Sequence, residues 1–170
     1  MDLRSCIRDI PDYPKEGIVF FDITPLLSNP AAFRYTVDAL AERFSDCGAT
    51  KIAAAEARGF LFGAPLAYKM GIGFVPVRKP GKLPYQTAQV TYDLEYGTDT
   101  LCMHVDAIEK GDKVLVIDDL LATGGTVGGM LQLLKNNGGD IVGIGFVIEL
   151  GFLDGTAKLQ GIPHEYLLKL

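Results

Sequence analysis

Hydrophobic residues recur along this chain with two different periods, one typical of helices and one typical of strands. Spacings of three and four predict helices over residues 3–10, 30–44, 60–70 and 127–134. The first of these is a short amphipathic helix ended by Pro11. The second begins with Asn29 as its N-cap and Pro30 in its first turn.

Short apolar or alternating runs predict strands over residues 51–55, 73–77, 101–105, 113–117, 141–150 and 165–169. The run Lys113–Ile117 is rich in β-branched residues, as in a strand that is buried on both faces. Residues 78–97 show no steady period and predict a long loop. Strands that alternate with helices predict an α/β fold, with a mostly parallel twisted sheet flanked by helices. We find no linker or repeat, so residues 1–170 are expected to form a single domain.

Composition narrows the class of protein further. The chain is 48% hydrophobic and 22% charged, which is typical of a globular protein. It has no apolar run of the about 18 residues that span a bilayer and no signal-peptide core, so we expect a cytoplasmic protein without a membrane partner. The net charge of −5 disfavours a nucleic-acid partner. Cys6, Cys47 and Cys102 form no metal or redox motif and are expected to be reduced and buried.

Ligands of such sheets bind beyond the carboxyl ends of the strands. That rule selects residues 56–59, 78–97, 118–126 and the strand end at Leu150. In the second of these segments three cations lie within five residues and the next carboxylate is Asp93. Such a cluster on an acidic protein indicates a small anionic ligand, although a solvated loop would show the same charge run.

The segment from Val114 to Thr126 carries the strongest chemical signal. A buried strand leads into Asp118 and Asp119, and a turn of small residues then enters a helix. Two adjacent carboxylates are costly unless a cation or hydroxyl groups meet them. The turn exposes backbone N–H groups at a helix start, where an anion is favoured. The segment therefore predicts a sugar phosphate site, the alternative being an ordinary capped strand–turn–helix. A P-loop is excluded because no lysine follows the glycines.

This segment resembles the signature of the type I phosphoribosyltransferases, in which a hydrophobic strand, two acidic residues and Ala-Thr-Gly-Gly-Thr follow one another. Four further motifs resemble the adenine branch of that family, and similarity in register extends from about Ile7 to Leu150. These motifs are Phe20-x-Asp22-Ile-x-Pro25-Leu-Leu, Arg58-Gly-Phe-Leu-Phe-Gly, Val77-Arg-Lys-Pro-Gly-Lys-Leu-Pro84 and Leu94-Glu-Tyr-Gly97.

The resemblance implies a role for each motif. Asp118 and Asp119 would hold the ribose hydroxyls of phosphoribosyl pyrophosphate. The 5-phosphate would lie on Ala122, Thr123, Gly124, Gly125 and Thr126. Pyrophosphate would contact Glu56, Ala57, Arg58, Arg78, Lys79 and Lys82, with Arg58 and Arg78 also acting in catalysis. Cations there would stabilise the charge that the leaving group gains.

The resemblance also implies how the base is held. Val19 would bind adenine through its main chain, Phe20 would stack on it, and Leu150 would contact it from the opposite side. Glu95 would act near the purine as a proton acceptor or an electrostatic stabiliser. One departure is Phe21, at a site that is basic in several relatives, so the neighbouring pocket is expected to be more apolar here.

The implied reaction is purine salvage: adenine and phosphoribosyl pyrophosphate give AMP and pyrophosphate. Mg²⁺ would assist, held mainly by the substrate and without a direct protein ligand. The family implies a homodimer, a small hood formed by about residues 1–25, and a loop 82–97 that closes as a lid. Two alternatives remain open, an enzyme of the same class that uses another base and a non-catalytic sensor of the donor.

Overall fold

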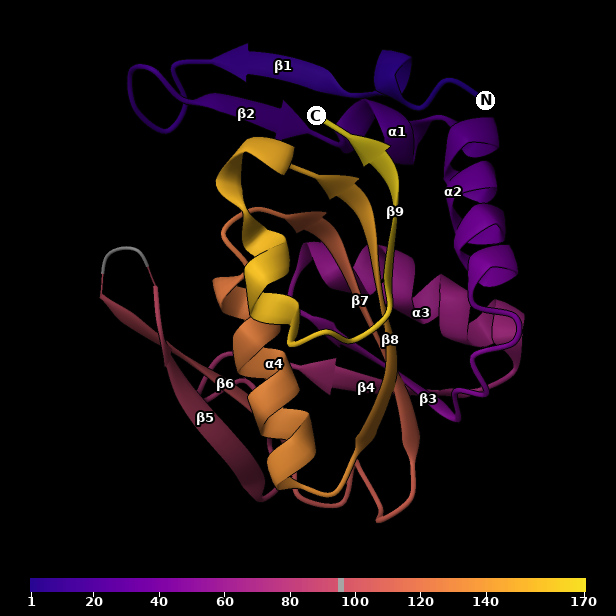
Figure 1. The fold of residues 1–170 in the computed structure, drawn as a ribbon, viewed down its shortest axis with the longest axis vertical. Coiled ribbons are helices and arrows are strands. Elements are labelled where there is room, and N and C mark those ends of the chain that lie inside the picture. The colour runs from indigo at the N-terminus through magenta and orange to yellow at the C-terminus, as the bar shows by residue number, and fades with distance from the viewer. Residues whose placement is uncertain (95–96) are drawn as a thin grey trace.

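The computed structural model describes residues 1–94 and 97–170. Its centre is a five-stranded sheet in the order β4-β3-β7-β8-β9, and every neighbouring pair is parallel. The strands are β3 (Lys51–Ala55), β4 (Gly73–Val77), β7 (Lys113–Leu121), β8 (Asp140–Glu149) and β9 (His164–Lys169). Figure 1 shows the strong twist of this sheet. The α/β class and the parallel sheet predicted from the sequence are confirmed.

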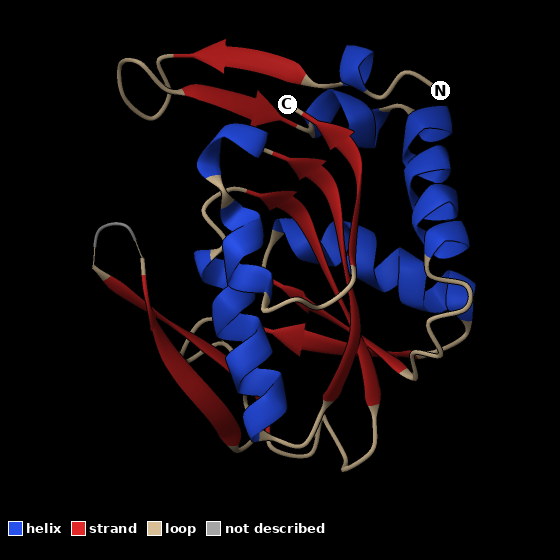
Figure 2. Ribbon diagram, in the orientation of Figure 1, coloured by secondary structure: helices blue, strands red, loops and turns tan. Residues whose placement is uncertain are grey.

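Helices cover both faces of the sheet (Figure 2). One face packs against α2 (Pro30–Arg43) and α3 (Arg58–Met70), and the other against α4 (Gly125–Asn136). The two layers of core meet at β7, where the side chains of Val114, Leu115, Val116 and Ile117 are fully buried. A strand that is buried on both faces is what its β-branched run predicted.

The helix predictions over residues 30–44, 60–70 and 127–134 hold apart from small shifts of their ends. The Asn29 side chain accepts hydrogen bonds from the amides of Ala31 and Ala32 at 3.0 and 3.2 Å, so it caps α2 as expected. A short helix, α1 (Thr24–Ser28), precedes it. Two short 3₁₀ segments, η2 (Gly151–Leu153) and η3 (Gly155–Leu159), connect β8 to β9.

The helix predicted over residues 3–10 is wrong. Only η1 (Arg4–Cys6) is helical, and β1 (Arg8–Pro11) pairs antiparallel with β2 (Val19–Asp22). Leu3 and Ile7 are both buried, as a helix would also require. A 3₁₀ turn followed by extended backbone satisfies that spacing equally, and the ladder to β2 decides between the two. The resulting two-stranded hood lies beyond one end of the main sheet, next to η2 (Figure 1).

The long loop predicted over residues 78–97 is also wrong in part. It contains β5 (Thr87–Asp93), which pairs antiparallel with β6 (Thr98–His104). Val90 and Tyr92 are buried between exposed neighbours, a period-two pattern within the segment. The hairpin lies beside α4, outside the main sheet, and a bridge between Arg78 and Cys102 connects it to the end of β4 (Figure 1).

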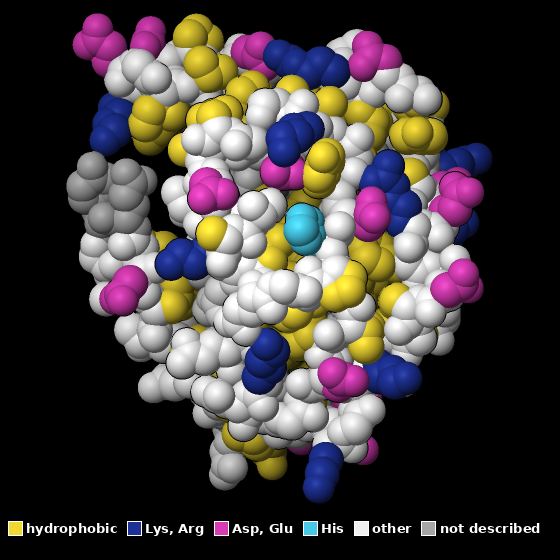
Figure 3. All heavy atoms as spheres, in the orientation of Figure 1, with side chains coloured by type: hydrophobic (Ala, Val, Ile, Leu, Met, Phe, Trp, Pro, Cys, Tyr) yellow, Lys and Arg dark blue, Asp and Glu magenta, His cyan; other side chains and the backbone are white. Residues whose placement is uncertain are grey.

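Figure 3 shows Lys, Arg, Asp and Glu side chains interspersed over one face, without a patch of one sign there. Within the described ranges, no helix is long and apolar enough to cross a membrane. All three cysteines are free, but only Cys102 is buried, whereas Cys6 and Cys47 are half-buried. The expectation of three buried thiols is therefore wrong for two of them.

Candidate active site

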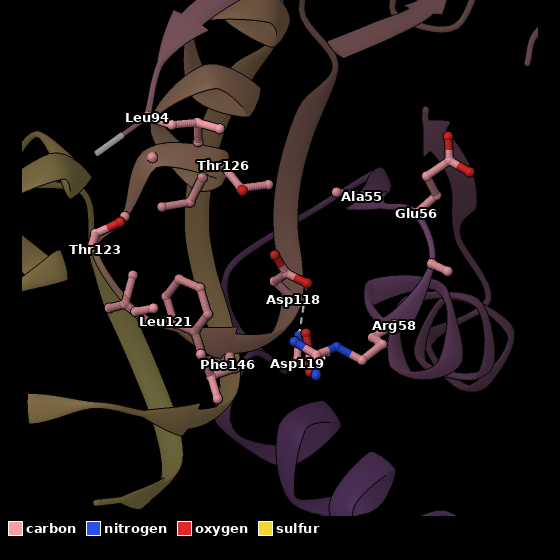
Figure 4. A pocket seen from close by; sticks show the side chains of 16 residues that line it. Ala55, Glu56, Arg58, Leu94, Asp118, Asp119, Leu121, Thr123, Thr126 and Phe146 are labelled. Atoms are coloured by element: carbon pink, nitrogen blue, oxygen red, sulfur yellow. Dashed lines mark hydrogen bonds and ion pairs between the residues drawn. The ribbon is translucent and has the colours of Figure 1, made fainter. Parts of the chain in front are cut away.

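A cavity of about 270 Å³ lies at the carboxyl ends of β3 and β7, between the first turns of α3 and α4 (Figure 4). This is the edge of the sheet where the sequence places a ligand. The cavity is lined by Ala55, Glu56, Ala57, Arg58, Leu94, Asp118, Asp119, Leu120, Leu121, Ala122, Thr123, Gly124, Gly125, Thr126, Val127 and Phe146. Ten of these residues were predicted from the sequence.

Asp118 and Asp119 form the floor of the cavity. They lie within β7, which continues to Leu121, and not in a turn beyond it. Asp119 is 3% exposed, and its amide donates a 2.9 Å hydrogen bond to Oδ1 of Asp118. Burial, reinforced by the Asp119 charge, raises the pKa of Asp118 well above its usual range. Burial also raises the pKa of Asp119, against the opposing effect of Arg58. The two carboxylates are thus crowded, and that of Asp119 is almost fully removed from solvent.

Arg58 connects this floor to the hood. Its Nε lies 2.9 Å from Oδ2 of Asp119. That contact has ion-pair distance but not hydrogen-bond geometry, so Oδ2 lacks a hydrogen-bond partner within the described residues. The guanidinium carbon also lies 5.4 Å from the centre of the Phe20 ring, a cation–π distance. One side chain therefore spans the predicted sugar and base sites.

The first turn of α3 comes unusually close to the acid pair. A Cβ at Gly59 would lie 3.0 Å from Oδ1 of Asp118, so any larger residue would push the helix away from the strand. The Glu56–Ala57 peptide that precedes the helix is cis. This loop forms the wall opposite the start of α4 (Figure 4).

The loop Ala122–Gly125 leads from β7 into α4. Gly124 has a φ of 80°, and a Cβ there would lie 2.6 Å from the carbonyl oxygen of Gly155. Glycine is therefore required both by the backbone and by the space. No side chain caps α4, so N–H groups of its first turn are left for a ligand. Such a helix start favours an anion, as the sequence predicted.

The predicted cations Arg78, Lys79 and Lys82 do not line the cavity and lie behind Glu56, which does. Arg78 pairs with Glu56 at 3.1 Å, and the amide of Lys79 donates to the same carboxylate at 2.5 Å. The ammonium group of Lys79 pairs with Asp99. The amide of Lys79, followed by the guanidinium of Arg78, lowers the pKa of Glu56. Along the sequence no carboxylate lies nearer to these cations than Asp93, but folding brings Glu56 and Asp99 to them. Lys82 is exposed, and its carbonyl accepts from Arg78 at 3.1 Å.

The residues predicted to bind the base are near the cavity but do not line it. Phe20 is half-buried, faces Arg58 and has Tyr13 edge-on at 5.3 Å. Val19 is 47% exposed, whereas Leu150 is buried. Phe21 points to the opposite face of β2 from Phe20 and packs against the core, which accounts for an apolar residue there. The remaining prediction, Glu95, lies outside the described residues.

The cavity also contains residues that were not predicted as site residues. Leu94 reaches it from the β5–β6 hairpin, and Leu121 from the end of β7. Phe146 lies opposite Asp118 in the parallel ladder of β7 and β8. Phe146 could be predicted only from this register, because the rule that ligands bind at strand ends selects Leu150 on β8 instead. Over the described ranges, no group of three or more His, Cys, Asp or Glu side chains could enclose a metal ion.

Comparisons with known proteins agree with this geometry. The model of the phosphoribosyl transferase domain matches residues 22–161. The chain is also 69% identical to the adenine phosphoribosyltransferase of Solidesulfovibrio magneticus, over 100% of this chain and 99% of that one. The chain belongs to the phosphoribosyltransferase family, in its adenine branch. The resemblance carried by the sequence motifs is thereby confirmed.

Solved phosphoribosyltransferases share the fold over nearly the whole chain. The crystal structure of the adenine phosphoribosyltransferase from Thermoanaerobacter pseudethanolicus has a TM-score of 0.97 at 52% identity, covering 99% of this chain and 98% of that one. The Saccharomyces cerevisiae enzyme has a TM-score of 0.92 at 40% identity, covering 98% and 97%. It was crystallised with adenine and an imino-altritol bisphosphate. The hood and the hairpin are therefore parts of the family fold as it occurs in this branch.

Proposed function

We propose that this chain transfers the 5-phosphoribosyl group of phosphoribosyl pyrophosphate to adenine, giving AMP and pyrophosphate in cytoplasmic purine salvage. This is the activity of the branch to which the chain belongs, and the one expected from its motifs. One observation supports it above all others. A crowded acid pair, an uncapped helix start and a bridging arginine surround a single cavity.

The floor and the α4 wall suit the sugar phosphate. Ribose hydroxyls can donate to Asp118 and Asp119, which supplies the hydrogen bonds that Oδ2 of Asp119 lacks. The 5-phosphate then meets the loop Ala122–Thr126 at the start of α4. Since sugar hydroxyls stabilise the ionised carboxylates, donor binding also relieves their crowding.

The side of the cavity formed by the loop before α3, with Arg78 behind it, suits the leaving group. In the reaction the bond from C1 of ribose to the pyrophosphate oxygen breaks, and its electron pair leaves with pyrophosphate. A purine nitrogen bonds to C1 and releases its proton. Charge builds up on the pyrophosphate oxygens, so the cations of Arg58 and Arg78, with Lys82 nearby, favour the transition state over the ground state. Glu95 is proposed as the group that accepts the proton or stabilises the sugar cation.

Mg²⁺ fits this site only in part. Asp118 and Asp119 are hard oxygen donors of the type it prefers, but two carboxylates are too few for a cage made by the protein. We therefore propose that the donor's own oxygens hold the ion, without a direct protein ligand. When bound, it would neutralise part of the pyrophosphate charge.

The hood suits the base. In this proposal Phe20, beside Arg58, stacks on the base, the Val19 main chain binds it, and Leu150 contacts it from the opposite side. In this proposal residues 1–25 are a hood within one domain of residues 1–170. The hairpin tip carrying Leu94 would close over the cavity and exclude water from the sugar cation.

A homodimer is also proposed. Leu61, Ala64 and Tyr68 fall at positions i, i+3 and i+7 of α3 on its outer face, and Tyr68 is 90% exposed. An apolar stripe of this kind suits a partner surface. Light scattering of Tyr68→Asp should show a shift toward monomer, while an unchanged mass would place the interface elsewhere.

The test of the function mixes the protein with phosphoribosyl pyrophosphate, Mg²⁺ and each purine base in turn. Adenine presents a donor at C6 and an acceptor at N1, whereas hypoxanthine and xanthine present the reverse. Two unpaired buried groups cost about 1–3 kcal/mol each, so kcat/KM should favour adenine by about 10³. A 6-oxopurine within about tenfold would reassign the base. If the protein binds phosphoribosyl pyrophosphate but forms no nucleotide with any base, the result would support the alternative of a non-catalytic sensor.

A further inference from the structure

Tyr92 and Asp99 face each other across the β5–β6 hairpin, just below the tip that carries Leu94. The Tyr92 hydroxyl donates to Oδ2 of Asp99 at 3.3 Å, and the same oxygen pairs with the ammonium group of Lys79. Asp99 also accepts from the amide of Thr100 at 2.8 Å. Tyr92 is 8% exposed, and its hydroxyl lies beside the partly exposed charged groups of Asp99 and Lys79.

The ring of Tyr92 also lies against α4. A Cβ at Gly129 would come within 2.6 Å of Cδ1 of Tyr92, and one at Gly125 within 4.0 Å of Cε2. The absence of a side chain at Gly129 thus makes the space for this ring. Burial raises the pKa of the Tyr92 phenol, while a hydrogen bond with the Thr126 side chain opposes that rise. The ring edge at Cε2 of Tyr92 therefore lies against the first turn of α4, which contains Gly125 and Thr126.

We propose that Tyr92 is a positioning residue for the 5-phosphate loop. Its hydroxyl orients the Thr126 hydroxyl, and the Asp99–Lys79 ion pair orients Tyr92. This inference rests on the proposed function, in which Thr126 belongs to the 5-phosphate site. It also changes the expected role of Lys79, whose ammonium group is engaged by Asp99 and supports the loop from behind instead of contacting pyrophosphate.

The arrangement explains why the hydroxyl of Tyr92, and not only its ring, belongs at this position. The ring alone would fill the space above Gly129. The hydroxyl adds a connection from the hairpin stem to the phosphate loop, through residues on β5, β6 and the segment after β4. Binding of the 5-phosphate is therefore coupled to the position of Leu94 through Tyr92.

The decisive variant is Tyr92→Phe, which keeps the ring and removes the hydroxyl. The KM for phosphoribosyl pyrophosphate and the Kd for ribose 5-phosphate, measured by calorimetry, should both rise about three- to tenfold, as expected for one lost hydrogen bond. The KM for adenine should stay at the wild-type value. Tyr35→Phe, which removes an exposed hydroxyl on α2, is the matched control and should change neither constant.

A double-mutant cycle with Asp99→Asn extends the test. If Asp99 acts through Tyr92, the double variant should bind ribose 5-phosphate about as weakly as Tyr92→Phe alone. Ribose 5-phosphate affinity within about twofold of wild type in Tyr92→Phe, or additive losses in the cycle, would overturn the proposal. Equal weakening for both substrates would show a merely structural role. Failure of the wild type to form AMP would refute the proposed function instead, since the binding measurement does not depend on turnover.

Discussion

On the β7 side of the cavity, Asp118 and Asp119 lie next to each other and face Arg58, whereas on the β4 side Arg78 and Lys79 each meet a carboxylate. The first side carries excess charge of one sign in a buried place, and the pKa of both acids is raised. The second side is balanced, and the pKa of Glu56 and Asp99 is lowered.

The two sides therefore differ in how their interactions within the protein change when a ligand binds. In the proposed function, ribose hydroxyls at the acid pair would reduce the repulsion between the two carboxylates. Pyrophosphate bound as proposed would have to compete with Glu56 for Arg78. The acid side is therefore expected to oppose folding and serve the ligand, while the basic side supports both.

The largest effect is expected from Asp118→Asn combined with Asp119→Asn. Turnover should fall by at least about 10³, because both acceptors for the ribose hydroxyls are weakened together. Far-UV circular dichroism should show an unchanged fold, since neither carboxylate supports the core. Product formation from adenine near the wild-type rate would show that the acid pair is not the sugar site.

Arg78→Ala should have the next largest effect. Losing a charge-assisted contact should weaken pyrophosphate and donor binding about ten- to a hundredfold, with adenine binding unchanged. Inhibition by pyrophosphate and the two KM values separate these outcomes. Equal losses for both substrates would identify Arg78 as a support for the β4–β6 bridge instead.

Asp118→Asn alone should raise stability at neutral pH by about 0.5–2 kcal/mol. Because the folded chain holds a proton on Asp118 more tightly than the unfolded chain, stability falls as pH rises from 3.8 toward the raised pKa. The variant lacks this loss, so its advantage in Tm should shrink as pH is lowered toward 3.8. A Tm advantage that does not change with pH would show that the added stability does not come from the ionisation of Asp118.

Glu56→Gln should give the smallest effect and the opposite sign. The free energy of unfolding should fall by about 0.5–1 kcal/mol at neutral pH, since a partly exposed ion pair is lost. Because folding lowers the pKa of Glu56 from 4.5, the ionised carboxylate stabilises the fold above pH 4.5. This stabilisation is lost as the pH falls from 4.5 through the lowered pKa, so the difference from wild type should vanish in acid. Titration with pyrophosphate should show tighter binding, because Arg78 is released. Glu42→Gln, at an exposed position of α2, is the control.

The same contrast explains what the sequence could predict. Asp118 and Asp119 follow a buried β-branched run, and neighbouring residues alone make that pattern unusual. The small residues of the loop into α4 come next in the sequence, so the same local pattern includes them. The partners of Arg78 and Lys79 come from residues 20 or more positions away, so no local pattern contained them. The two hairpins were missed for a similar reason, because cross-strand ladders decide between an apolar spacing in a helix and one in a strand.

The position of the β5–β6 hairpin has a consequence for local unfolding. Its strands bond to each other and, through the Arg78–Cys102 bridge, to the segment after β4, but not to the five-stranded sheet. Opening the hairpin therefore leaves the β3–β7–β8 ladders intact. Its amides should exchange with deuterium well before those of β7, and the hairpin should behave as a separate cooperative unit. Exchange that slows in β5 and β6 when ribose 5-phosphate binds would show the phosphate loop stabilising that unit from a distance.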